Sequence, residues 1–130
     1  MRNNMKAFKI YLVVLLSIIF FGCSNLKDDK QLTIDIFTKA LASNGMSLGK
    51  KTEKMYGLLM ATDGYSIDVN GESIEIYQFN TTIKSGKDAI ENWKNEGYMG
   101  HSVVVNRNLM LFTNNKHKNW EEIIKVFNEL

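Results

Sequence analysis

The stretch that decides the fold reads Tyr65-Ser66-Ile67-Asp68-Val69-Asn70-Gly71-Glu72-Ser73-Ile74-Glu75-Ile76-Tyr77-Gln78-Phe79. Apolar and polar residues alternate on both sides of Asn70-Gly71, which is typical of two β-strands joined by a two-residue turn. Such a turn pairs Val69 with Glu72, Ile67 with Ile74, and Tyr65 with Ile76. The turn and the alternation agree on one register, so the sequence predicts a β-hairpin here.

Other segments extend the predicted sheet. Residues 102–105 and 109–113 are rich in strand-forming side chains and flank Asn106-Arg107-Asn108, which indicates a second hairpin. The apolar segment 55–61 is predicted to be a further strand. Residues 46–54 are basic and irregular, and we expect them to form a loop.

Three segments have helical periodicity. Apolar residues lie on one helical face between Gln31 and Asn44, and Gly45 follows as a stop. A second helix is predicted to begin with Ser85 as its cap and to end at Gly97. A third begins at Asn119 with a capping-box-like sequence and runs to the last residue.

These elements predict an α+β fold. We expect an antiparallel sheet of four to five strands, containing the two hairpins, with three helices packed mainly on one face. One-sided helices must bury their apolar stripe, and the sheet offers the surface for it.

The beginning of the chain has the pattern of a secretory signal peptide. Residues 1–9 carry three cations and no acid, and residues 10–21 are apolar except for Ser17. A membrane-spanning helix needs roughly 20 apolar residues, so this run is too short to remain as one.

The apolar run ends in Phe20-Phe21-Gly22-Cys23, which resembles the lipobox of bacterial lipoproteins. The resemblance implies cleavage between Gly22 and Cys23 and a diacylglyceryl group on Cys23, with fatty acids such as palmitate. Two acyl chains anchor stably, and an N-acyl chain on the new amino group would add to them. The chain is similar in this respect to small uncharacterised lipoproteins of Gram-positive bacteria, which implies the extracytoplasmic side of the cell membrane.

The predicted organisation is a signal peptide over 1–22, a lipidated cysteine and flexible tether over 23–30, and one domain over 31–130. The signal peptide holds three of the 16 basic residues and none of the 14 acidic ones, so the remaining 108 residues carry 13 basic and 14 acidic groups, a net charge of −1. A near-neutral domain argues against nucleic acid as a partner.

No catalytic or metal-binding motif appears in the sequence. His101 and His117 are sixteen residues apart in predicted loops and are interpreted as surface histidines, and the only cysteine is assigned to lipid. A group of acids near the first hairpin could suggest acid–base chemistry or Ca²⁺ binding, but a solvated sheet face explains it equally well; its members are Asp63, Asp68, Glu72 and Glu75. We therefore expect no metal, no cofactor and no enzyme.

The aromatic residues are the remaining recognition material. Trp93 and Trp120 fall on apolar helix faces and are expected in the core. If helices cover one sheet face, Tyr77 and Phe79 lie on the other face or under a loop, and they are the candidate contact patch.

The sequence favours a non-catalytic lipoprotein that binds a protein or peptide near the membrane, for example an immunity or accessory envelope lipoprotein. A small-ligand-binding lipoprotein is the alternative, although such carriers usually close two lobes on a solute. An envelope enzyme is the third hypothesis.

Overall fold

In the computed structural model, which describes residues 30–113 and 116–130, the predicted hairpin forms around Asn70-Gly71. Strands β2 (Asp63–Val69) and β3 (Glu72–Gln78) pair in the predicted register, with Ile67 opposite Ile74. Asn70 and Gly71 have φ angles of 52° and 87°. Both angles are positive, as a turn whose twist matches the flanking strands requires.

The hairpin is the centre of a five-stranded antiparallel sheet with the order β1-β2-β3-β5-β4. The second predicted hairpin is also present, formed by β4 (Val104–Asn106) and β5 (Leu109–Phe112). Strand β5 pairs with β3, so the two hairpins lie side by side. The predicted α+β class and antiparallel sheet are therefore confirmed.

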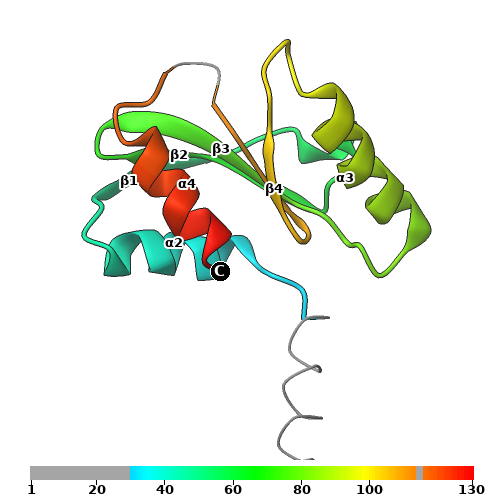
Figure 1. Ribbon diagram of the computed structural model, residues 1–130, viewed down its shortest axis with the longest axis horizontal. Coiled ribbons are helices and arrows are strands. Elements are labelled where there is room, and N and C mark those ends of the chain that lie inside the picture. The colour runs from blue at the N-terminus through cyan, green and yellow to red at the C-terminus, as the bar shows by residue number, and fades with distance from the viewer. Residues whose placement is uncertain (1–29, 114–115) are drawn as a thin grey trace, which may run out of the picture. The chain divides into compact units, whose positions relative to one another are not determined.

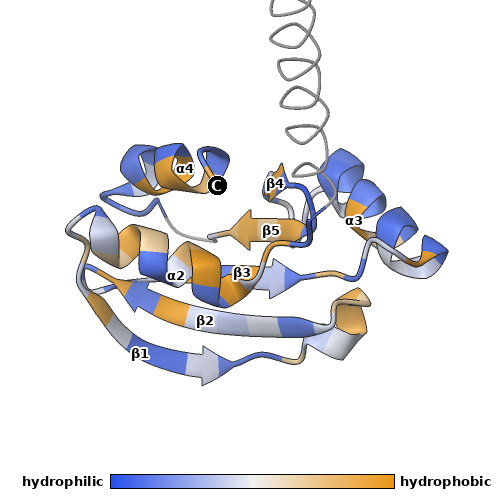
Figure 2. Ribbon diagram, turned by 90° about the horizontal axis from the view of Figure 1, so that it is seen from below, coloured by the Kyte–Doolittle hydropathy of each residue, from blue (hydrophilic) through white to orange (hydrophobic). Residues whose placement is uncertain are grey.

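The fifth strand comes from a segment that was predicted to be a loop. Strand β1 (Leu48–Glu53) pairs with β2 at the sheet edge, and all six of its residues are exposed. A strand that buries no side chain has no apolar alternation, so the sequence contains no signal for it. Figure 2 shows the contrast between β1, mostly hydrophilic or neutral, and β5, which is hydrophobic along its length.

The predicted strand at residues 55–61 is wrong. Residues Tyr56–Leu59 form a short 3₁₀-helix, η2, and only Leu59 of its four residues is buried. Met60 then takes a left-handed conformation with a φ of 63°. The segment is apolar because part of it packs against α3. It is too short for its apolar spacing to distinguish a strand from a helix.

The three predicted helices are α2 (Ile34–Ser43), α3 (Lys84–Glu96) and α4 (Trp120–Asn128). Thr33 caps α2 by accepting a hydrogen bond from the Ile36 backbone N–H at 3.2 Å. The predicted Ser85 cap is wrong, because the N-cap of α3 is Ile83, two residues earlier, and it has no side-chain capping bond. Gly97 ends this helix as predicted.

The predicted capping box of α4 does not form. Asn119 stands at the N-cap without a side-chain capping bond. Its side-chain oxygen instead accepts a hydrogen bond from the Asn70 amide at 3.0 Å, which ties the start of α4 to the hairpin turn. Asn70 also exchanges two hydrogen bonds with Ser47, each 2.8 Å, just before β1. The turn therefore connects three elements.

The helices lie on both faces of the sheet (Figure 1), two on one face and one on the other. Helices α2 and α4 pack against Ile67, Ile74 and Leu111, and the rings of Phe37 and Phe127 meet edge to face 5.3 Å apart. Helix α3 and η2 pack against the opposite face, over Tyr77 and Met110. Adjacent residues of β3 and β5 thus enter different hydrophobic cores, as strand pleating requires.

Asn108 joins the N-terminus of the domain to the sheet. Its side-chain oxygen accepts from the Leu32 N–H, and its amide donates to the Leu32 and Phe79 carbonyls, at 2.8, 2.8 and 3.1 Å. It is fully buried, and these bonds satisfy its polar atoms. A compact unit therefore begins at Gln31 and extends to Leu130.

Replacing Asn70 by alanine is expected to destabilise the fold by about 3–4 kcal/mol. Alanine in the left-handed conformation costs roughly 1–2 kcal/mol, and each lost side-chain hydrogen bond adds about 1 kcal/mol. Urea unfolding measures the difference. Asn44→Ala is the matched control, since Asn44 also precedes a glycine but has a φ of −91°, and a loss as large as that of Asn70→Ala would contradict the account of the turn.

Candidate functional site

The predicted contact patch is wrong, because Tyr77 and Phe79 are both only 1% exposed. The prediction placed the helices mainly on one sheet face and left these two side chains on the other face or under a loop, whereas α3 and η2 cover the face on which they lie. Trp93 and Trp120, which were expected in the core, are half-buried, and each packs against one of the two hydrophobic cores.

His117 is also buried, in contrast to its interpretation as a surface histidine. It is 4% exposed, because the segment before α4 crosses the end of the first hairpin. Its Nε2 lies 2.9 Å from the Val69 carbonyl and its Nδ1 accepts from the Asn119 N–H at 3.0 Å. These contacts fix the tautomer with the proton on Nε2, and they describe a structural histidine. His101 is exposed.

The acidic residues near the first hairpin do not converge on one site. Asp68 accepts from the Ser73 hydroxyl, and Glu72 accepts from the Lys118 N–H. Glu75 forms an ion pair with Lys54, and Asp63 accepts from the Gly64 N–H. Within residues 30–113 and 116–130, no three His, Cys, Asp or Glu side chains are placed to hold a metal ion.

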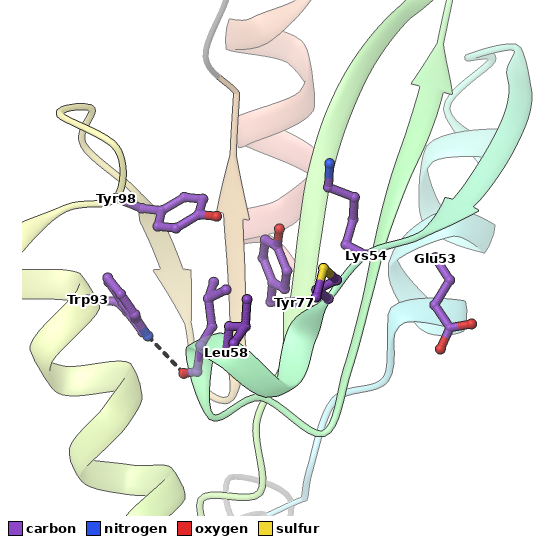
Figure 3. Close-up of a pocket in the computed structure, with 8 residues that line it drawn as sticks. Glu53, Lys54, Leu58, Tyr77, Trp93 and Tyr98 are labelled. Atoms are coloured by element: carbon purple, nitrogen blue, oxygen red, sulfur yellow. Dashed lines mark hydrogen bonds between the residues drawn. The ribbon is translucent and has the colours of Figure 1, made fainter.

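The candidate site is a groove of about 510 Å³ between η2, the end of β1 and the C-terminal half of α3. Figure 3 shows Leu58, Tyr77, Trp93 and Tyr98 arranged around it. A second hollow of about 200 Å³ lies on the other side of Leu58, where Met60 faces Asn92 and Glu96 of α3. Leu58, Leu59 and Trp93 line both hollows, so the two depressions are neighbours.

Aromatic rings form the wall of the groove. Tyr98 lies at the centre, edge to face with the rings of Trp93, Phe112 and Tyr77 at 5.5, 4.9 and 6.3 Å between centroids. The Trp93 indole N–H donates to the Leu59 carbonyl at 3.0 Å, which fastens η2 to α3. These contacts hold the wall in one arrangement before any ligand binds.

Tyr77 forms the floor because β2 has a glycine opposite it. Gly64 pairs with Tyr77, and a Cβ atom at Gly64 would lie 2.6 Å from Cδ1 of the ring. Only a residue without a side chain lets the ring lie this close to the backbone.

At the polar end of the groove, the charges of Lys54 and Glu75 neutralise each other. The Lys54 Nζ lies 3.1 Å from Glu75 Oε1, which also accepts from the Tyr77 hydroxyl at 3.3 Å. Burial, followed by the negative charge of Glu75, raises the pKa of the Tyr77 hydroxyl above its ordinary value of 10.0. The Glu53 carboxylate points away from the aromatic rings (Figure 3). The groove is thus mainly an apolar surface.

Large apolar side chains are exposed at the groove and next to it: Met55 and Leu58 line the groove, Met60 lines the second hollow, and Met99 is the chain neighbour of Tyr98. Met55 and Leu58 are each 76% exposed, Met60 is 60% exposed, and Met99, which follows Tyr98, is 70% exposed. We call these four residues the apolar rim. The sequence analysis did not identify the rim, because residues 55–61 were predicted to form a strand.

Two of the rim residues have a backbone conformation that methionine disfavours. Met60 and Met99 have φ angles of 63° and 49°. Met99-Gly100 forms a tight turn closed by two hydrogen bonds between Tyr98 and His101, and the chain places Asn-Gly at the comparable hairpin turn. Left-handed backbone costs roughly 1–2 kcal/mol for a residue other than glycine or asparagine, so the fold alone does not account for methionine here.

Gly22, Cys23 and the rest of the predicted signal peptide and tether, up to residue 29, lie outside the described residues. Among the described helices, none is both long and apolar enough to cross a membrane. Comparison with known proteins gave no match to any family model, curated protein or solved structure.

Replacing Gly64 by alanine is expected to destabilise the protein by about 1–3 kcal/mol, the usual effect of overpacking a core. The new methyl group would push the Tyr77 ring toward Tyr98, so near-ultraviolet circular dichroism should change together with the thermal unfolding midpoint. Gly57→Ala is the control, since a Cβ there meets nothing within 4 Å. Equal effects of the two substitutions would contradict the packing of Tyr77 on β2.

Alkaline pH should reveal the environment of Tyr77. Below about pH 10 the hydroxyl is protonated in both the folded and the unfolded chain. As the pH rises further, only the unfolded chain releases this proton, so stability falls. Urea unfolding between pH 8 and 11 should therefore show a smaller loss for Tyr77→Phe than for the wild type. Parallel losses in the two proteins would contradict the raised pKa.

Proposed function

We propose that the protein is a lipid-anchored lipoprotein on the extracytoplasmic side of the cell membrane, and that it binds a protein or peptide without catalysing a reaction. The binding surface in this proposal is the groove together with the apolar rim. The observation that carries it is the exposure of Met55 and Leu58 in the aromatic-walled groove, together with that of Met60 and Met99, which follow the groove residues Leu59 and Tyr98 in the chain.

The chemistry of the rim supports a macromolecular partner. Exposed apolar side chains that gather next to a groove are typical of interaction sites, whereas scattered ones are not. Methionine is flexible and polarisable, and it is frequent on surfaces that accept partners of varied shape. The apolar side of a peptide could cover the rim while single side chains enter the depressions on either side of Leu58.

The position of the groove in the fold also supports a partner other than lipid. Gln31, the first residue of the compact unit, bonds with Thr81 just before α3 begins. The groove contacts α3 at Trp93, near the other end of this 13-residue helix. Most of the helix therefore lies between the groove and the attachment point of the proposed tether, about 14 Å at 1.5 Å per residue.

The volume of the groove favours a small-ligand-binding lipoprotein as the second candidate. About 510 Å³ falls within the range of small-molecule pockets, roughly 300–1,000 Å³. A small solute would leave the rim uncovered, which is why the peptide partner is preferred. A shift of the thermal unfolding midpoint on adding a small solute, without any protein partner, would favour this second candidate.

The proposed anchor predicts that Cys23→Ala abolishes lipidation and leaves the precursor uncleaved. Cells fed with a radioactive fatty acid should label the wild-type protein and not the variant, and the variant should migrate as the longer chain. Equal label in both proteins would refute the lipid anchor at Cys23. Binding at the groove would still have to be tested separately.

The proposed binding surface predicts a specific photocrosslink from the rim. A photoreactive phenylalanine analogue at Leu58 should give a discrete adduct in intact cells, whereas the same analogue at the exposed Lys39 on α2 should not. Met60→Asn with Met99→Asn should reduce the yield. Because asparagine tolerates left-handed backbone, the free energy of unfolding should stay level or rise by about 1 kcal/mol. The absence of an adduct from position 58 would contradict the proposal. An adduct whose yield is unchanged in the double variant would contradict it as well.

A further inference from the structure

The five methionines of the described residues fall into two groups with very different exposure. Met55, Met60 and Met99 are 76%, 60% and 70% exposed, whereas Met46 and Met110 are 8% and 0% exposed. The exposed group supplies three of the four residues of the apolar rim. The buried group lies in the two hydrophobic cores, one residue in each.

We propose that the three rim methionines are a modification site at which peroxide switches the binding surface off. This inference rests on the proposed function of the rim. The sulfur of each thioether attacks one oxygen of hydrogen peroxide, and the O–O bond breaks. The second oxygen takes up the proton of the first and leaves as water. Sulfur is oxidised by two electrons to the sulfoxide, and the peroxide is reduced.

Access to the sulfur atom determines which methionines react. The rim sulfurs belong to side chains that solvent reaches directly, and the core sulfurs do not. Peroxide should therefore oxidise the rim at concentrations that leave Met46 and Met110 intact. Since the rim contributes little buried surface, the fold survives this oxidation.

The sulfoxide changes the chemistry that the rim offers to a partner. It replaces a flexible apolar group by a polar one with a strong hydrogen-bond acceptor. Leu58 would then be the only apolar rim residue, and an apolar segment would have to desolvate three sulfoxides to reach the aromatic wall. Oxidation therefore weakens binding at the groove without unfolding the protein.

The experiment uses the full-length protein with the photoreactive residue at Leu58, produced in its membrane and treated with graded hydrogen peroxide. Peptide mass spectrometry follows the added oxygen at each methionine, and the crosslink yield is measured on the same samples. We expect oxidation at residues 55, 60 and 99 to be at least tenfold faster than at 46 and 110. We expect the crosslink yield to fall at least fivefold as the rim becomes oxidised.

The matched control is the same oxidised sample treated with methionine sulfoxide reductases, which return the sulfoxides to thioethers. The crosslink should return as the added oxygen is removed. Equal oxidation rates at exposed and buried methionines would overturn the inference, as would a crosslink that persists on the oxidised rim or one that stays lost after the rim is reduced again. A missing crosslink before treatment would instead refute the proposed function, and the oxidation pattern would still be measured independently.

Discussion

The structure depends on the alternation of side chains along the two central strands. In β3, Ile74 and Ile76 enter the core beneath α2 and α4, whereas Tyr77 enters the core beneath α3. A slip of one residue would exchange the two sets of side chains, so the register must be fixed. The turn at Asn70-Gly71 fixes it, and hydrogen bonds from Asn70 to Ser47 and Asn119 attach β1 and α4 to the same point.

The second face of the sheet is only partly covered, and the groove follows from this. Strand β2 buries Ile67 and Val69 on the first face, but it presents Ser66 and Asp68 on the second. Helix α3 and η2 therefore cover only the apolar part of this second sheet face, which lies over β3 and β5. The groove lies where this cover ends, and Glu75, Lys54 and the Tyr77 hydroxyl mark the boundary with the polar part. The proposed binding surface is thus continuous with the apolar face that packs under α3 and η2.

The sequence predicted the elements that bury a periodic apolar face, namely both hairpins and all three helices. It failed for β1, whose residues are all exposed, and for η2, which is too short to have a period. Tyr77 and Phe79 were misplaced because no local pattern shows that α3 packs on the second face. The rim depends on left-handed backbone at Met60 and Met99, which residue types alone did not indicate. The anchor at Cys23 remains a prediction from the lipobox resemblance.

The central claim is that a partner covers the groove and its rim while the protein is in its membrane. Amide hydrogen exchange tests this most directly, measured by mass spectrometry on native membranes and on detergent-purified protein. We predict slower exchange in the membranes for residues 55–61 and 92–100, and equal exchange in the two samples for residues 67–76 of the central hairpin. Equal exchange throughout would contradict the claim, as would membrane protection confined to α2 or β1.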